Sequence, residues 1–193
     1  MKENLRIAVL FTIVTTTVFG LLYPLAVTGL SQLIFPSQAN GELIVKNGRV
    51  IGSSLIGQPF SSDPYFHPRP SAAGSGYDPE APSGGASNLG PTNKALVDRV
   101  NSEIQKLRAE NPDAPVPIDL LTTSASGLDP DISPAAAEFQ VPRVARARHI
   151  SQESLRALVA KHTQDRQFGI LGEPRVNVLE LNLELDQMFP MRK

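Results

Sequence analysis

The part of this chain that most resembles a chemical motif is a run of small residues, Ser83-Gly84-Gly85-Ala86-Ser87-Asn88-Leu89-Gly90. Backbone amides near glycine can cradle an anion, and a helix N-terminus, predicted just after this run, favours negative charge. The run lacks the Gly-Lys-Ser/Thr ending of a P-loop. A turn before a helix is the favoured interpretation; a phosphate site here would use Ser83, Gly84, Gly85, Ser87 and Asn88.

No other set of polar residues forms a catalytic or metal-binding pattern. The histidines lack the spacing of metal ligands: His67, His149 and His162. Asp129 and Asp131 do not supply the number of oxygen ligands that calcium needs. No Gly-x-Ser-x-Gly nucleophile motif is present. Three arginines in a predicted short helix could form an interface or bind carboxylates, although a solvated face is the default: Arg143, Arg146 and Arg148. We predict no catalytic and no metal site.

A long apolar segment precedes these residues. No charged residue occurs from Ile7 to Asn40, whereas about 20 apolar residues suffice to cross a bilayer. We predict a transmembrane helix over residues 7–35, a short N-terminal segment over 1–6 and a soluble domain over 36–193. The alternative is a cleaved signal peptide ending at Ser37-Gln38-Ala39, but signal peptides have apolar cores of about 7–15 residues.

The charges beside the span indicate its orientation. Lys2 and Arg6 precede it, and the next basic residue is Lys46. Because positive residues stay on the cytoplasmic side, we expect a cytoplasmic N-terminus and an extracytoplasmic domain, although Lys46 and Arg49 are near enough to weaken the bias.

The span also has one face of small residues. Ala8, Thr12, Thr16 and Gly20 are spaced four apart. Small residues at this spacing let a second helix approach closely, and threonine hydroxyls can bond across the contact. We predict that this face docks on a partner helix.

Composition narrows the class of the soluble part. There is no cysteine, so a disulfide framework is excluded, and the domain must be stabilised by its own core or by a partner. The formal net charge is −1 without a basic block, so no nucleic-acid partner is indicated.

Local signals predict a small α+β domain. Residues 42–51 form a hairpin around Asn47-Gly48, a pair that tolerates positive φ. Residues 58–91 are rich in proline yet contain several aromatics, so we expect an ordered loop that contacts the domain or a partner, with Tyr65, Phe66 and Arg69 in the contact surface.

The helical periodicity is clearest over residues 92–110, where Leu96, Val100, Ile104 and Leu107 form one apolar stripe. A short helix from Ser133 through Phe139, a further turn from Pro142 and a helix capped by Ser151 follow. Residues 176–185 fit either a half-buried strand or a helix.

Several strings, in order along the domain, resemble the KdpC family. They include Leu55-Ile56-Gly57-Gln58-Pro59-Phe60, Tyr65-Phe66-His67-Pro68-Arg69-Pro70, Ser87-Asn88-Leu89-Gly90-Pro91-Thr92, Ser124-Ala125-Ser126-Gly127-Leu128-Asp129-Pro130, Gln140-Val141-Pro142-Arg143 and Gly172-Glu173-Pro174-Arg175-Val176. The resemblance implies a non-catalytic, single-pass subunit of a bacterial inner-membrane, ATP-driven potassium pump. Its implied partners are a channel-like subunit, a P-type ATPase subunit, a small single-span subunit and the lipid bilayer.

The resemblance implies no cofactor for this chain itself, since ATP and potassium are used by the complex. The family is also credited with raising nucleotide affinity through the segment that is Ser83–Asn88 here, although Ala86 interrupts it and an extracytoplasmic domain meets no ATP. A membrane-tethered enzyme and a stand-alone binding or scaffold domain are the alternatives from other classes.

Overall fold

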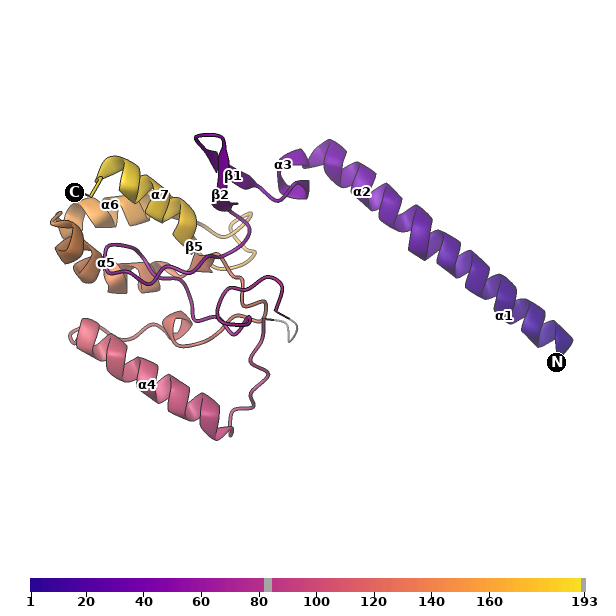
Figure 1. Cartoon of the computed structure of the whole chain (residues 1–193), viewed down its shortest axis with the longest axis horizontal. Coiled ribbons are helices and arrows are strands. Elements are labelled where there is room, and N and C mark those ends of the chain that lie inside the picture. Colours follow the sequence, from indigo (N-terminus) through magenta and orange to yellow (C-terminus); the bar gives the residue numbers. More distant parts are fainter. Residues whose placement is uncertain (82–84, 192–193) are drawn as a thin grey trace. The chain divides into compact units, whose positions relative to one another are not determined.

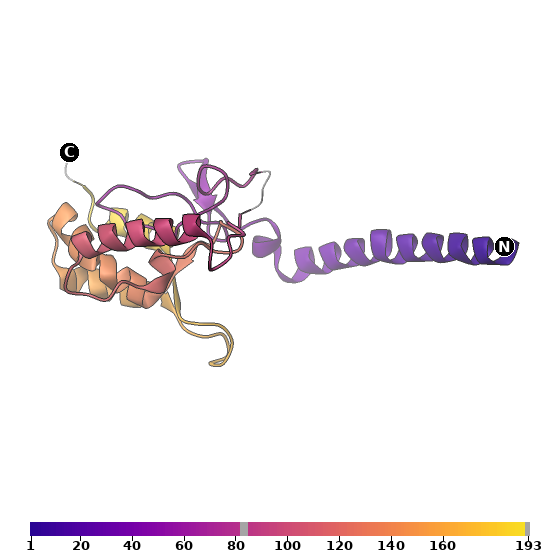
Figure 2. The same cartoon turned by 90° about the horizontal axis from the view of Figure 1, so that it is seen from below.

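The computed structural model describes residues 1–81 and 85–191, and the chain divides into two compact units, Met1–Ile51 and the part from Gly52 onward. Figures 1 and 2 show both. The first unit holds a long apolar helix and most of a hairpin. The second is a folded domain of helices and a small sheet, which confirms the predicted α+β class.

The apolar helix is one run of 33 residues, Lys2–Ile34, long and apolar enough to cross a membrane. It comprises α1 (Lys2–Thr15), a π-helical turn η1 (Thr16–Leu22) and α2 (Tyr23–Ile34), and a short α3 (Pro36–Ala39) follows. The π turn ends beside Pro24, which has no N–H and crowds the carbonyl one turn earlier. The wider turn lets Tyr23 donate its N–H to the carbonyl of Val18 instead.

The predicted hairpin is confirmed. Strands β1 (Leu43–Lys46) and β2 (Arg49–Ser53) pair with each other. Asn47 and Gly48 have φ of 53° and 74°, the positive values that the tight turn requires.

The domain is built around an antiparallel sheet in the order β3 (Asp131–Ile132), β5 (Arg175–Asn177), β4 (Thr163–Gln164). Helices α5 (Pro134–Arg148), α6 (Gln152–His162) and α7 (Val178–Met188) gather around it (Figure 1). Their buried faces form one core, whose largest fully buried apolar side chains are Phe66, Leu155, Leu181, Leu185, Val141, Val144 and Val176.

One expectation about helices was wrong, and one open alternative is now decided. Pro142 does not end the helix that begins at Pro134: α5 continues through it to Arg148. Val141, Val144 and Ala145 around the proline are all buried, and we attribute the continuity to this packing, which outweighs the loss of one backbone hydrogen bond. Residues 176–185, which fitted either a strand or a helix, form a strand only to Asn177. The side chain of Asn177 accepts from the Glu180 N–H and caps the start of α7.

Helix α4 (Lys94–Glu110) confirms the predicted periodic segment, with Asn93 as its N-cap. The structure describes every residue of this helix, and none of them is fully buried. Its apolar stripe is only half-buried. Polar contacts help to attach it: Arg99 donates to the carbonyl of Leu121, and Asn111, just after the helix, donates to that of Phe139. A 3-10 turn, η2 (Ile118–Leu120), lies in the connection to the sheet.

Candidate functional site

The proline-rich segment of residues 58–91 forms an ordered loop, with neither helix nor strand in its described part. Two buried side-chain amides hold it. Asn182 of α7 accepts from the N–H of Phe66 and donates to its carbonyl, both at 2.9 Å. Gln140 of α5 does the same for His67, at 2.7 and 3.1 Å. Each amide thus replaces a neighbouring strand, and each donor and acceptor is satisfied without a sheet.

Two of the three α5 arginines hold the same loop. Arg143 donates to the carbonyls of Asp63 and Tyr65 at 2.6 and 2.9 Å, and pairs with Glu110 at 2.9 Å. Arg148 donates to the carbonyl of Pro64 at 2.7 Å. The solvated-face default is therefore wrong for Arg143 and Arg148, and only Arg146 is exposed.

The ring of Tyr65 joins the same network. Its hydroxyl donates to Asp186 at 3.0 Å, and the Arg148 guanidinium lies 4.8 Å from its ring centre. Burial and the Asp186 carboxylate raise the pKa of the Tyr65 phenol. Arg148 also pairs with Asp186 at 2.7 Å and is almost completely buried, so the cluster links the loop to α5 and α7.

The predicted contact surface is thus partly used within the domain. The side chain of Phe66 is fully buried in the core, so a partner does not reach it in this structure. Arg69 pairs with Asp129 at 2.8 Å, and about a quarter of each side chain is exposed. The fold brings Tyr65, Phe66 and Arg69 into one loop. Sequence reasoning missed Gln140 and Asn182, since a lone amide in an amphipathic helix gives no signal of its partner.

Ser83 and Gly84 of the glycine-serine run lie outside the described residues. Gly85 lies directly against the backbone of residues 126–127: a Cβ built on it would stand 1.5 Å from the carbonyl oxygen of Ser126. A Cβ built on Gly127 would in turn stand 2.6 Å from the carbonyl oxygen of Gly85. Ser87 is half-buried, and Asn88 is exposed with φ of 52°. Gly85 therefore has a packing role that needs no ligand.

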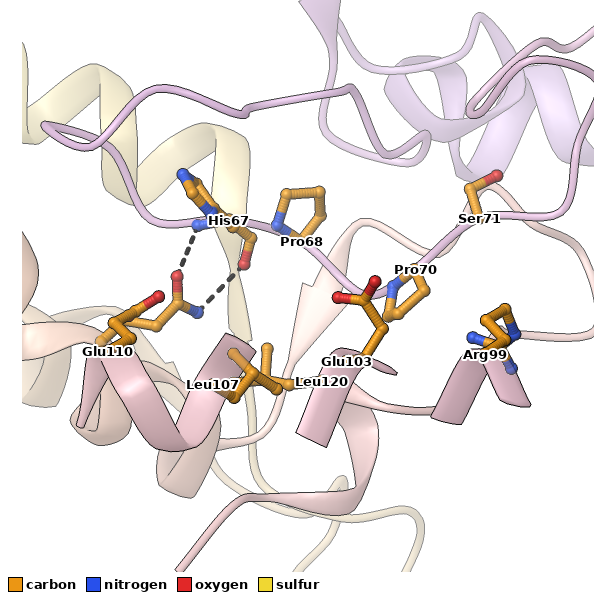
Figure 3. A pocket seen from close by; sticks show the side chains of 10 residues that line it. His67, Pro68, Pro70, Ser71, Arg99, Glu103, Leu107, Glu110 and Leu120 are labelled. Carbon is orange, nitrogen blue, oxygen red and sulfur yellow. Dashed lines mark hydrogen bonds between the residues drawn. The ribbon is translucent and has the colours of Figure 1, made fainter. Parts of the chain in front are cut away.

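A cleft of about 360 Å³ lies between the proline-rich loop of residues 58–91 and α4. It is lined by His67, Pro68, Pro70, Ser71, Arg99, Glu103, Leu107, Glu110, Leu120 and Gln140. Figure 3 shows Glu103, Leu107 and Glu110 facing the loop across it. Both carboxylates are paired, Glu103 with Lys106 at 2.7 Å and Glu110 with Arg143. Burial, and then Arg143, lower the pKa of the His67 imidazole.

This cleft has no assembled nucleophile and base. His67 Nε2 meets the carbonyl oxygen of Ser62 at 3.1 Å, a structural contact. Within the described part of the chain no cluster of three or more His, Cys, Asp or Glu residues could hold a metal ion. The cleft shows no arrangement that would support acid-base or nucleophilic chemistry.

In the apolar helix, Thr16 and Gly20 share a face, since a Cβ built on Gly20 would contact the Thr16 methyl at 3.7 Å. The hydroxyl of Thr15 donates a hydrogen bond to the Phe11 carbonyl at 2.8 Å. Ala8, Thr12, Thr16 and Gly20 are all exposed, and each remains a predicted contact.

Residues 5–187, nearly the whole chain, match the family model described as KdpC: K+-transporting ATPase, c chain. The chain belongs to the KdpC family. A protein of Koribacter versatilis named "Potassium-transporting ATPase KdpC subunit" is 59% identical over 191 residues, which cover 99% of this chain and 98% of the relative. Proteins with the same name from Acidobacterium capsulatum (61% over 187 residues, 96% and 99% of the two chains) and Rhodopseudomonas palustris strain BisB18 (57% over 197 residues, 96% and 98%) are similar to it.

The match to the KdpC family includes both the apolar helix and the domain, so the resemblance drawn from the short strings is confirmed along almost the entire length. The loop held by Gln140 and Asn182, together with Gly85 and Ser126, lies within the matched range.

Proposed function

We propose that this chain is an accessory, non-catalytic subunit of an ATP-driven potassium pump, and that it stabilises assembly of the channel-like and P-type ATPase subunits. The family membership supports a place in the pump. The observation that carries the accessory role is the apolar run Lys2–Ile34, which has no buried residue within this chain. Such a helix is satisfied by lipid and by the helices of other subunits.

We further propose that the N-terminus is cytoplasmic and that the domain lies outside, over the outer mouth of the channel-like subunit. The charges of Lys2 and Arg6 support this orientation. The domain would shape ion entry there, with the exposed parts of the loop around Tyr65 and Arg69 as contact surface. The small single-span subunit would be the third partner.

Regulation of nucleotide affinity receives less support. Gly85 is accounted for by backbone packing against Ser126, and the described part of the run offers no lysine for a phosphate. A domain outside the membrane would also meet no ATP.

The test is co-purification of the pump from membranes of cells grown at low potassium, using a tag on this chain. Gly20→Leu places a bulky side chain on the small-residue face, and we expect it to reduce recovery of the other subunits several-fold. Gly29→Leu is the matched control, because a Cβ at Gly29 has no neighbour within 4 Å. Recovery of this chain alone from the unaltered strain would contradict the proposal.

A further inference from the structure

The hairpin between β4 and β5 carries large apolar side chains at its tip. Phe168, Ile170 and Leu171 expose 84%, 75% and 53% of their surface. Figure 2 shows this hairpin projecting from the lower edge of the domain. Exposed apolar groups gathered at one projecting point indicate a contact with another molecule.

The conformation of the tip gives a second indication. Phe168 and Gly169 have φ of 54° and 75°. A turn with two positive φ values favours Asn-Gly or Asp-Gly, and an aromatic residue at the first position costs local stability. Phe168 is therefore a poor choice for the turn itself, and strain of this kind is found where function requires the side chain.

The backbone of the tip is already satisfied internally. Gln167 and Leu171 exchange two hydrogen bonds at 2.8 and 2.9 Å, and Gly169 and Ile170 donate to the carbonyls of Arg166 and Gln167. Burying these groups in an apolar environment would leave few of them unpaired. The tip is thus a preformed knob, which binds at low entropic cost.

The charges of the hairpin favour a protein over a lipid surface. Residues 164–175 contain two arginines and two carboxylates, so the formal charges of this segment cancel. Arg166 pairs with Glu173 at 2.6 Å, and Arg175 pairs with Asp131 at 3.1 Å. Apolar elements that enter anionic membrane surfaces carry unpaired lysine or arginine beside them, and both arginines here are paired.

We propose that the tip of Phe168, Ile170 and Leu171 inserts into an apolar recess on the extracytoplasmic face of another subunit of the pump. The proposal rests on the proposed function, which supplies the partner. Three side chains make a small contact, so the tip is an anchor within a larger interface, with Phe168 as the buried aromatic at its centre.

The decisive variant is Phe168→Asn in the full-length tagged chain. Asparagine suits the turn, so the variant chain should be at least as resistant to heat as the original. The loss of the buried aromatic contact should increase the dissociation rate of the purified complex by about tenfold or more. Ala157→Asn, on an exposed face of α6, is the control: it should leave the dissociation rate unchanged, and any loss of heat resistance reflects only the lower helix propensity of asparagine.

A photoreactive benzoylphenylalanine at position 168 identifies the occupant. We expect a cross-link to another pump subunit in the assembled complex. A lipid adduct, a cross-linked pair of this chain, or an intact complex without any cross-link would each overturn the proposal. Failure to recover the complex with the original chain would instead contradict the proposed function, so the two failures are distinguishable.

Discussion

At the scale of single residues, long-range hydrogen bonds determine where the aromatic loop lies. Gln140 and His67 are 73 residues apart in sequence, and Asn182 and Phe66 are 116 apart. Each amide satisfies both the N–H and the carbonyl of one loop residue. Loss of either amide would leave buried backbone groups unpaired, at a cost of about 1–3 kcal/mol for each group.

Arg148 provides the sharpest stability test. It contacts the carbonyls of Pro64 and Phe189 and the carboxylate of Asp186. Arg148→Met should lower the free energy of unfolding by about 3 kcal/mol, because its partners lose a buried cation. Urea unfolding of the full chain in detergent, followed by circular dichroism, measures this. Arg156→Met, in an ion pair that is half exposed, should cost about 1 kcal/mol or less; equal losses would contradict the assignment.

His67 should make the stability depend on pH. Its folded-state pKa is lowered by burial and by Arg143. The unfolded chain therefore binds a proton below about pH 6.5 while the folded chain resists it, and stability falls as the pH decreases. His67→Asn should flatten the stability profile between about pH 6.5 and 5. A His67→Asn profile that falls as steeply as that of the original chain would contradict the role assigned to His67.

At the scale of elements, two loops pack backbone to backbone at Gly85 and Ser126. Gly85→Ala places a Cβ where the Ser126 carbonyl lies, so the loops must separate, at a cost of about 1–3 kcal/mol. Gly90→Ala, in the same run but with no neighbour within 4 Å, should stay within about 0.5 kcal/mol. Thermal unfolding of both variants checks this. A neutral Gly85→Ala would contradict the packing role.

At the scale of the whole molecule, the orientation can be tested cleanly because the chain has no cysteine. We expect Ala157→Cys to react with a membrane-impermeant maleimide on intact spheroplasts. Asn4→Cys should react only after lysis, since Lys2 and Arg6 keep the N-terminus inside. The reverse labelling pattern would place the domain in the cytoplasm and remove the main objection to a nucleotide role.

Features with a local cause were predictable from the sequence alone. An uncharged apolar run, an Asn-Gly turn and a periodic apolar stripe each depend on neighbours within a few residues. The apolar helix, the hairpin and α4 were therefore predicted, and the α+β class followed from them. The family was recognisable for the same reason, since short strings keep their order along the chain.

Other features were decided only by tertiary structure. The continuation of α5 through Pro142, the division of the tail into β5 and α7, and the burial of Phe66 depend on packing against distant segments. The same holds for Arg143 and Arg148, whose partners come from the loop some 80 residues earlier. Local periodicity carries no information about such partners, because a buried arginine and a solvated one have the same spacing in sequence.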